Sequence, residues 1–167
     1  MSNSGQMNPL GLKQANIIID KALAKARDMG VKPLAVVVID GSGHIIAAQR
    51  EDGASMFRVD VGLGKAWASV AMGASSRALA KRAKDNPAFF HTLAQTAQGK
   101  FLPQPGGVLI KNAKGEIIGA AGASGGTGEE DEAACVAGIE AAGLVADAAG
   151  WVSSVESWVL STKPIIG

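Results

Sequence analysis

The 167-residue chain has little of what marks a disulfide-bonded or metal-binding protein: one cysteine, two histidines and no tyrosine. A single cysteine cannot form an internal disulfide, and two distant histidines give no recognisable spacing of zinc ligands. We therefore expect no metal site. Cys135 follows two alanines, where a free cysteine usually packs as a small apolar side chain, so we expect it to be buried.

The chain also lacks an excess of positive or negative charge and long apolar runs. The 16 basic and 15 acidic residues leave a net charge of +1, with no basic stripe that could form a nucleic-acid footprint. The N-terminal segment has no basic region followed by an apolar core, and no apolar run approaches the roughly 20 residues of a membrane span. We therefore expect a cytoplasmic protein without a nucleic-acid or membrane partner.

Small residues are abundant where large aromatics are few. The chain has 22 glycines against three tryptophans and four phenylalanines, and 47% of its residues are hydrophobic. Small residues let backbones approach closely, so we expect the core to gain its contacts from tight packing of helices on a sheet.

Hydrophobic periodicity predicts alternating groups of helices and strands. The first helix should have Asn8 as its N-cap and Pro9 as its first residue and should end at Gly30, and the strand after Pro33 should be covered on both faces. The predicted helices span 9–29, 58–84, 88–98 and 129–142, and the predicted strands span 34–39, 44–50, 107–111 and 116–121. This order predicts an α+β domain with a single antiparallel sheet covered by helices.

A glycine-rich segment, 124–128, precedes the last helix and has two interpretations. Backbone N–H groups at a helix N-terminus can hold a phosphate or carboxylate. Alternatively, Thr127 and Glu130 fit a capping box, which would satisfy two of these N–H groups internally. The segment is neither a P-loop, because no Lys-Ser/Thr follows the glycines, nor a dinucleotide fingerprint, because no parallel βαβ unit surrounds it.

Five motifs occur in an order and at intervals that are similar to those of one family. They are Val38-Ile39-Asp40-x-x-Gly43, Arg50-x-Asp52-Gly53-Ala54, Lys65-Ala66, Pro105-Gly106-Gly107, and Gly119-x-x-Gly122-x-Ser124-Gly125-Gly126-Thr127-x-Glu129-x-Asp131-Glu132-x-x-Cys135. This pattern resembles the GlcG/HbpS family (haem-degrading domain), which includes the C-terminal domain of PduO-type proteins. The match covers about residues 12–143. It departs at Leu109, where the family pattern suggests proline, and it has no counterpart for the tail after Gly143.

The resemblance implies a profilin-like or roadblock-like layered fold, assembly into homo-oligomers, and a pocket that in some members holds haem. We therefore expect a GlcG/HbpS-like domain over residues 1–143, including the N-terminal helix, and a C-terminal extension over 144–167. Haem or another planar organic acid is the expected ligand.

The candidate site residues follow from the same motifs. Lys65 shares its helix face with small and apolar residues, so it could pair with Asp131, meet an acid group of a ligand, or reach water. Arg50 and Asp52 end a strand, where they could pair with each other or contact a ligand. The expected ligand-binding residues are Arg50, Asp52, Lys65, Gly106, Gly107, Ser124, Thr127 and His91. His44 and His91 are the only imidazoles available to haem iron.

Three functions remain open from the sequence. The first is a binding protein for a small ligand. The second is a cofactor-free enzyme acting on a small carboxylic or enamine-like catabolite, with Lys65 anchoring its acid group and Asp131 or Glu130 moving a proton. The third is an accessory subunit of a catabolic pathway, which would contact its partner through the tail around Trp151 and Trp158.

Overall fold

The computed structural model describes residues 10–149. Five helices and five strands alternate in groups along this part of the chain. They are α1 (Leu12–Asp28), β1 (Ala35–Asp40), β2 (Ile45–Arg50), α2 (Phe57–Met72), α3 (Ser76–Asp85), α4 (Pro87–Thr96), β3 (Gly107–Lys111), β4 (Ile117–Ser124), α5 (Gly128–Ala141) and β5 (Val145–Asp147). The strands form one sheet in the order β2-β1-β4-β3-β5, and every neighbouring pair is antiparallel. The predicted α+β class with a single antiparallel sheet is confirmed.

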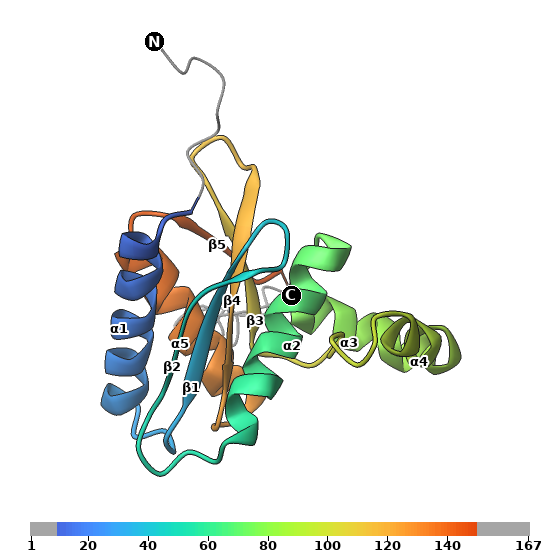
Figure 1. Cartoon of the computed structure of the whole chain (residues 1–167), viewed down its shortest axis with the longest axis horizontal. Coiled ribbons are helices and arrows are strands. Elements are labelled where there is room, and N and C mark those ends of the chain that lie inside the picture. The colour runs from blue at the N-terminus through green and yellow to red at the C-terminus, as the bar shows by residue number, and fades with distance from the viewer. Residues whose placement is uncertain (1–9, 150–167) are drawn as a thin grey trace, which may run out of the picture.

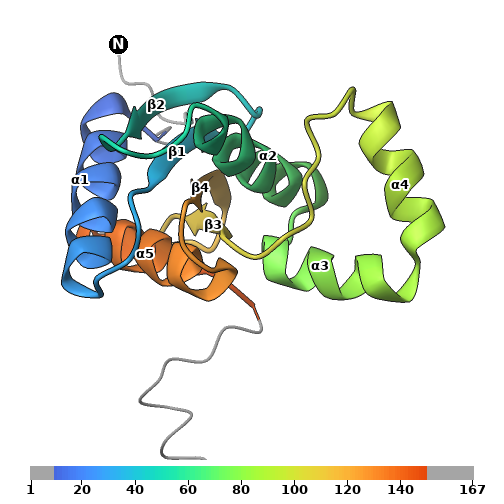
Figure 2. The same ribbon diagram turned by 90° about the horizontal axis from the view of Figure 1, so that it is seen from below.

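Helices cover both faces of the sheet (Figures 1 and 2). Side chains alternate along β1: Val36 and Val38 pack on the face under α1 and α5, while Val37 and Ile39 pack on the face under α2. All four are fully buried, which confirms that this strand is covered on both sides. The sheet therefore separates two apolar layers, and the larger one lies on the α1–α5 side.

Glycines permit the close approach of α2 to the sheet. A Cβ atom placed on Gly122 of β4 would collide with the backbone carbonyl of Gly62 in α2. Gly138 of α5 faces the carbonyl of Ile18 in α1 in the same way. The expectation that small residues bring helix and sheet backbones into contact is confirmed.

The single helix predicted over 58–84 is wrong, because two helices occupy this stretch. Gly73 ends α2 in a left-handed conformation, with φ of 62°, and the Ser75 hydroxyl accepts a hydrogen bond from the Ala78 N–H to begin α3. Together α3 and α4 project from the body of the domain (Figure 2). Leu79 of α3 and Phe90 of α4 belong to a small separate apolar cluster with Phe101 and with Ala68 of α2. The break therefore redirects the chain away from the sheet.

Two ends of predicted elements also differ. Asn8 and Pro9 lie outside the described residues, and α1 begins at Leu12 after Gly11. The sheet continues past Gly143, because β5 pairs with β3 and Lys111 Nζ lies 2.6 Å from Asp147 Oδ2. Of the extension expected over 144–167, residues 150–167 lie outside the described part. No helix within residues 10–149 is long and apolar enough to cross a membrane.

Candidate functional site

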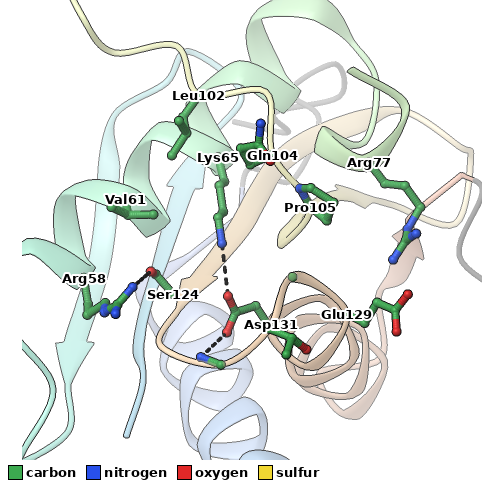
Figure 3. A pocket seen from close by; sticks show the side chains of 13 residues that line it. Arg58, Val61, Lys65, Arg77, Leu102, Gln104, Pro105, Ser124, Glu129 and Asp131 are labelled. Atoms are coloured by element: carbon green, nitrogen blue, oxygen red, sulfur yellow. Dashed lines mark hydrogen bonds and ion pairs between the residues drawn. The ribbon is translucent and has the colours of Figure 1, made fainter. Parts of the chain in front are cut away.

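A cavity of about 390 Å³ lies where α2, the segment before β3 and the start of α5 meet (Figure 3). Its wall combines charged and polar side chains with apolar ones. The lining residues are Arg58, Val61 and Lys65 of α2, Arg77 of α3, Leu102, Gln104 and Pro105 of the segment before β3, and Ser124, Gly126, Thr127, Gly128, Glu129 and Asp131 of β4 and α5. Four of the candidate site residues, Lys65, Ser124, Thr127 and Asp131, therefore line the same cavity.

A buried ion pair joins the two sides of this cavity. Lys65 Nζ lies 3.0 Å from Asp131 Oδ2, and the two side chains are only 7% and 2% exposed. Lys65 also donates to the Ala123 carbonyl at 2.9 Å, while Asp131 Oδ1 accepts the Gly126 N–H at 3.0 Å. Two charges are tolerated in the interior only when they are paired and hydrogen-bonded, and both conditions hold here. The pair therefore connects α2 to the start of α5.

Gly106 makes room for this ion pair, and Gly107 makes room for the Lys65 backbone and the Ser76 side chain. Gly106 has a φ of 121°, and a Cβ atom there would lie 2.8 Å from Lys65 Nζ and 3.1 Å from Asp131 Cβ. A Cβ atom on Gly107 would lie 2.9 Å from the Ser76 hydroxyl, which accepts the Gly107 N–H at 2.6 Å. Neither glycine lines the cavity, whereas the preceding Pro105 does.

A second ion pair, between Arg77 and Glu132, lies at one side of the cavity. The sequence did not predict it. Arg77 Nε donates to both oxygens of Glu132, at 3.0 and 3.1 Å, and the Glu132 side chain is fully buried. Burial raises the pKa of Glu132 above its usual value, although the hydrogen bond and the charge of Arg77 act in the opposite direction. No local pattern predicts this pairing, because Arg77 and Glu132 are 55 residues apart in the chain.

Arg58 is the second residue that the sequence analysis missed. Its Nη1 donates to the Ser124 hydroxyl at 3.3 Å, and it forms no ion pair within residues 10–149. It occupies the first turn of α2, where the helix dipole disfavours a cation. That unfavourable position was the one signal in the sequence that could have singled it out.

The capping-box interpretation of the last helix is confirmed. The Thr127 hydroxyl accepts the Glu130 N–H at 3.2 Å, and Glu130 Oε1 accepts the Thr127 N–H at 2.9 Å. Glu130 is not part of the cavity lining, whereas its neighbour Glu129 is, and Glu129 is exposed. The helix end is thus capped by its own side chains.

Other candidates lie away from the cavity. Arg50 donates to the Ala54 carbonyl at 3.2 Å, and the Arg50–Asp52 ion pair is not formed. His44 and His91 are exposed, and their nearest polar partners are Asp40 and Gln95. No group of three or more His, Cys, Asp or Glu residues between 10 and 149 could hold a metal ion.

Cys135 is fully buried, as expected, and its Sγ donates to the Gly106 carbonyl at 3.7 Å. Burial raises the pKa of this thiol far above its ordinary range. A thiol held in its neutral form is a poor nucleophile, so Cys135 packs behind the cavity and does not react within it.

The described residues form an α+β domain with a pocket lined by charged and apolar groups beside its sheet, an arrangement typical of small-ligand-binding domains. The chain belongs to the HbpS-like family, because the family model described as haem degrading protein HbpS-like matches residues 10–140 of the sequence.

Among the known proteins that are similar to it are one sequence relative and two solved structures. A 15.0 kDa protein of the dhaT-dhaS intergenic region of Citrobacter freundii is 30% identical over 132 residues, covering 78% of this chain and 90% of that protein. The crystal structure of a PduOC–haem complex is 26% identical with a TM-score of 0.71, covering 80% of this chain and 94% of that one. The crystal structure of HbpS is 27% identical with a TM-score of 0.70, covering 83% and 93% respectively.

Proposed function

We propose that this protein binds a small organic acid in the cavity between α2 and α5, with the carboxylate of the ligand at Arg58. One observation carries the proposal: Arg58 lines the cavity, is partly buried, and has a serine hydroxyl but no carboxylate as its partner within residues 10–149. A guanidinium group presents several donors to a carboxylate and recognises it with two parallel hydrogen bonds. Ser124 supplies a further hydroxyl at the same place.

The size of the cavity suits a small metabolite. Sites for small molecules commonly have volumes of about 300–1,000 Å³, and 390 Å³ is near the lower end of that range. Val61, Leu102 and Pro105 give the ligand an apolar wall, while the charged groups lie around it (Figure 3). This combination of apolar contact with a few oriented polar groups is typical of a binding site.

Binding is better supported than proton transfer. Both oxygens of Asp131 already accept hydrogen bonds, from Lys65 and from the Gly126 N–H, and Glu130 caps its helix. A general acid or base must reach the proton that it moves, and these carboxylates are engaged elsewhere. The enzyme hypothesis therefore has less support from the geometry than the binding hypothesis.

Haem is the second candidate ligand, because the related PduOC structure is a haem complex. The cavity does not fit ligation of haem iron, since its lining contains none of the His, Cys, Met or Tyr side chains that commonly bind it. The cations of the cavity could hold only the acid groups of such a molecule. Haem bound through iron would need another place, beside His44 or His91.

Titration calorimetry with butanoate and benzoate tests the proposal. We expect both carboxylates to bind the wild type, and Arg58→Gln to weaken binding by on the order of tenfold or more, because a charge-assisted hydrogen bond is lost. Arg50→Gln is the matched control: it removes an exposed arginine outside the cavity and should leave affinity unchanged. Equal affinity in the wild type and Arg58→Gln would overturn the proposal.

An absorbance titration with haemin tests the second candidate separately. Iron ligation by histidine predicts a saturable shift of the Soret band that is lost in His44→Ala or in His91→Ala. A shift that survives both substitutions would reject histidine ligation. The absence of any saturable shift would reject haem as the ligand.

A further inference from the structure

We propose that the ligand of this cavity is a zwitterion, with its carboxylate at the Arg58 end and an ammonium group at the Glu129 end. This inference rests on the proposed function and specifies the chemical class of the ligand. It follows from which charged groups around the cavity already have partners and which do not.

Two pairs of charges around the cavity neutralise each other. Lys65 and Asp131 form one ion pair at 3.0 Å, with both side chains at least nine-tenths buried. Arg77 and Glu132 form the other at 3.0 Å. Because each pair already balances its own charge, neither calls for an ion of the ligand.

Two lining residues of opposite charge remain. Arg58 and Glu129 form no ion pair within the described residues 10–149, and Glu129 accepts no hydrogen bond there through its side chain. Figure 3 shows them on opposite sides of the Lys65–Asp131 pair. A ligand that satisfies both must carry a negative group at one end and a positive group at the other.

The alternatives of the same size leave a mismatch. A dicarboxylate would place its second acid group near Glu129, where Arg77 is already neutralised by Glu132, so like charges would repel. A monocarboxylate would satisfy Arg58 and leave Glu129 without a partner. The apolar residues Val61, Leu102 and Pro105, which line the same cavity, suit a hydrocarbon spacer between the two ends.

Glu129 has one competing structural role. It lies in the first turn of α5 with Glu130 and Asp131, where any acidic residue is favoured by the helix dipole. That role predicts an effect of Glu129 on stability and none on the choice of ligand. Ligand preference, measured in matched variants, therefore separates the two roles.

The experiment is a calorimetric titration with three homologous series. They are straight-chain ω-amino acids from β-alanine upward, the monocarboxylates from propanoate upward, and the dicarboxylates from malonate upward. In the wild type we expect the best amino acid to bind more tightly than the dicarboxylate of equal length. Glu129→Gln should reduce the affinity ratio of amino acid to monocarboxylate by about two- to fivefold, the effect of a solvent-exposed ion pair.

Charge reversal sharpens the test. Glu129→Lys should invert the preference, so that the dicarboxylate binds more tightly than the amino acid. Arg58→Gln should weaken all three series, because each has a carboxylate. Glu140→Gln, which removes an exposed carboxylate from the opposite end of α5, is the control and should leave every affinity unchanged.

Each failure has its own pattern. Dicarboxylates that bind the wild type as tightly as amino acids, or an affinity ratio that Glu129→Gln leaves unchanged, would overturn the zwitterion while leaving an organic acid at Arg58 intact. If no carboxylate of any series binds, both the zwitterion and the proposed function are overturned.

Discussion

The ion pair between Lys65 and Asp131 links three elements of the cavity wall. Lys65 donates to a carboxylate of α5 and to a carbonyl of β4, so three elements meet at one ammonium group. Asp131 in turn holds the Gly126 N–H, which fixes the loop that enters α5. The elements that form the cavity wall are therefore held together before a ligand binds. The protein then loses less conformational freedom on binding.

Asp131→Asn should destabilise the protein by about 3–5 kcal/mol, because it leaves the buried Lys65 charge without its counter-ion. Urea unfolding of the variant measures this cost. The double variant Lys65→Met with Asp131→Asn is the control and should recover part of the loss, since no unpaired charge remains. A cost below about 1 kcal/mol for the single variant would show that the pair contributes no more than a surface ion pair.

The buried carboxyl of Glu132 predicts a pH dependence of stability. Since burial raises its pKa above the usual 4.5, the folded protein holds this proton more tightly than the unfolded chain does. The contribution of Glu132 to the free energy of unfolding should therefore decrease as the pH rises above about 4.5. The decrease is at most about 1.4 kcal/mol per pH unit.

Urea unfolding of the wild type and Glu132→Gln at a series of pH values checks this direction. The free energy of unfolding of the wild type minus that of Glu132→Gln should decrease between about pH 4 and pH 7. Only the wild type has a carboxyl group at this position that loses its proton in this range. A difference that increases with pH would mean that Arg77 dominates and holds the pKa of Glu132 below its usual value.

Close contact between α2 and β4 determines where the cavity lies. Gly62 and Gly122 bring the two backbones together, so Lys65, one turn further along α2, reaches across to α5. The break at Gly73 then carries α3 outward and places Arg77 on the far side of the cavity. The positions of Lys65 and Arg77 thus depend on glycines elsewhere in the chain.

Gly122→Ala should destabilise the protein by about 1–3 kcal/mol, the usual cost of overfilling a packed contact. The new methyl group would collide with the Gly62 carbonyl, a backbone atom that cannot rotate away. Gly41→Ala is the control, because the nearest atoms there lie at 3.8 Å, an ordinary contact distance. If thermal unfolding shows the two variants to be equally stable, the helix and sheet are not in close contact at Gly122.

The elements that the sequence predicted well are those with a strong local signal. The capping box of Thr127 and Glu130 depends only on neighbouring residues, and it is found. The break at Gly73 was missed because the apolar spacing continues across it. The periodicity of apolar residues predicted α1, whereas the capping box and the alanine-rich sequence after it predicted α5.

The site was only half predictable. Lys65 and Asp131 could be paired because the resemblance to the GlcG/HbpS family drew attention to both. Arg58 and Arg77 could not be placed, because their partners lie 66 and 55 residues away in the chain and carry no local pattern. Contacts of that kind depend on how α2, α3 and α5 pack together, which periodicity does not specify.

For the molecule as a whole, assembly into a homo-oligomer and the role of the tail remain predictions. A variant truncated after Ala149 tests the role of the tail. A truncation after Gly143 would also remove β5 and its pairing with β3. If Trp151 and Trp158 anchor an interface, the full chain should form an oligomer that light scattering shows to be larger than that of the truncated chain. Identical assembly in the two would reject the tail as a contact.

The location of the bound acid is the central claim, and amide NMR of isotope-labelled protein titrated with butanoate tests it most directly. The account predicts saturable shifts at Ser124, Gly126 and Gly128, which line the cavity, and unchanged signals at His44 and His91. The shifts should weaken strongly in Arg58→Gln. Shifts confined to α4 or to the β1–β2 hairpin, or no saturable shift at all, would contradict the account.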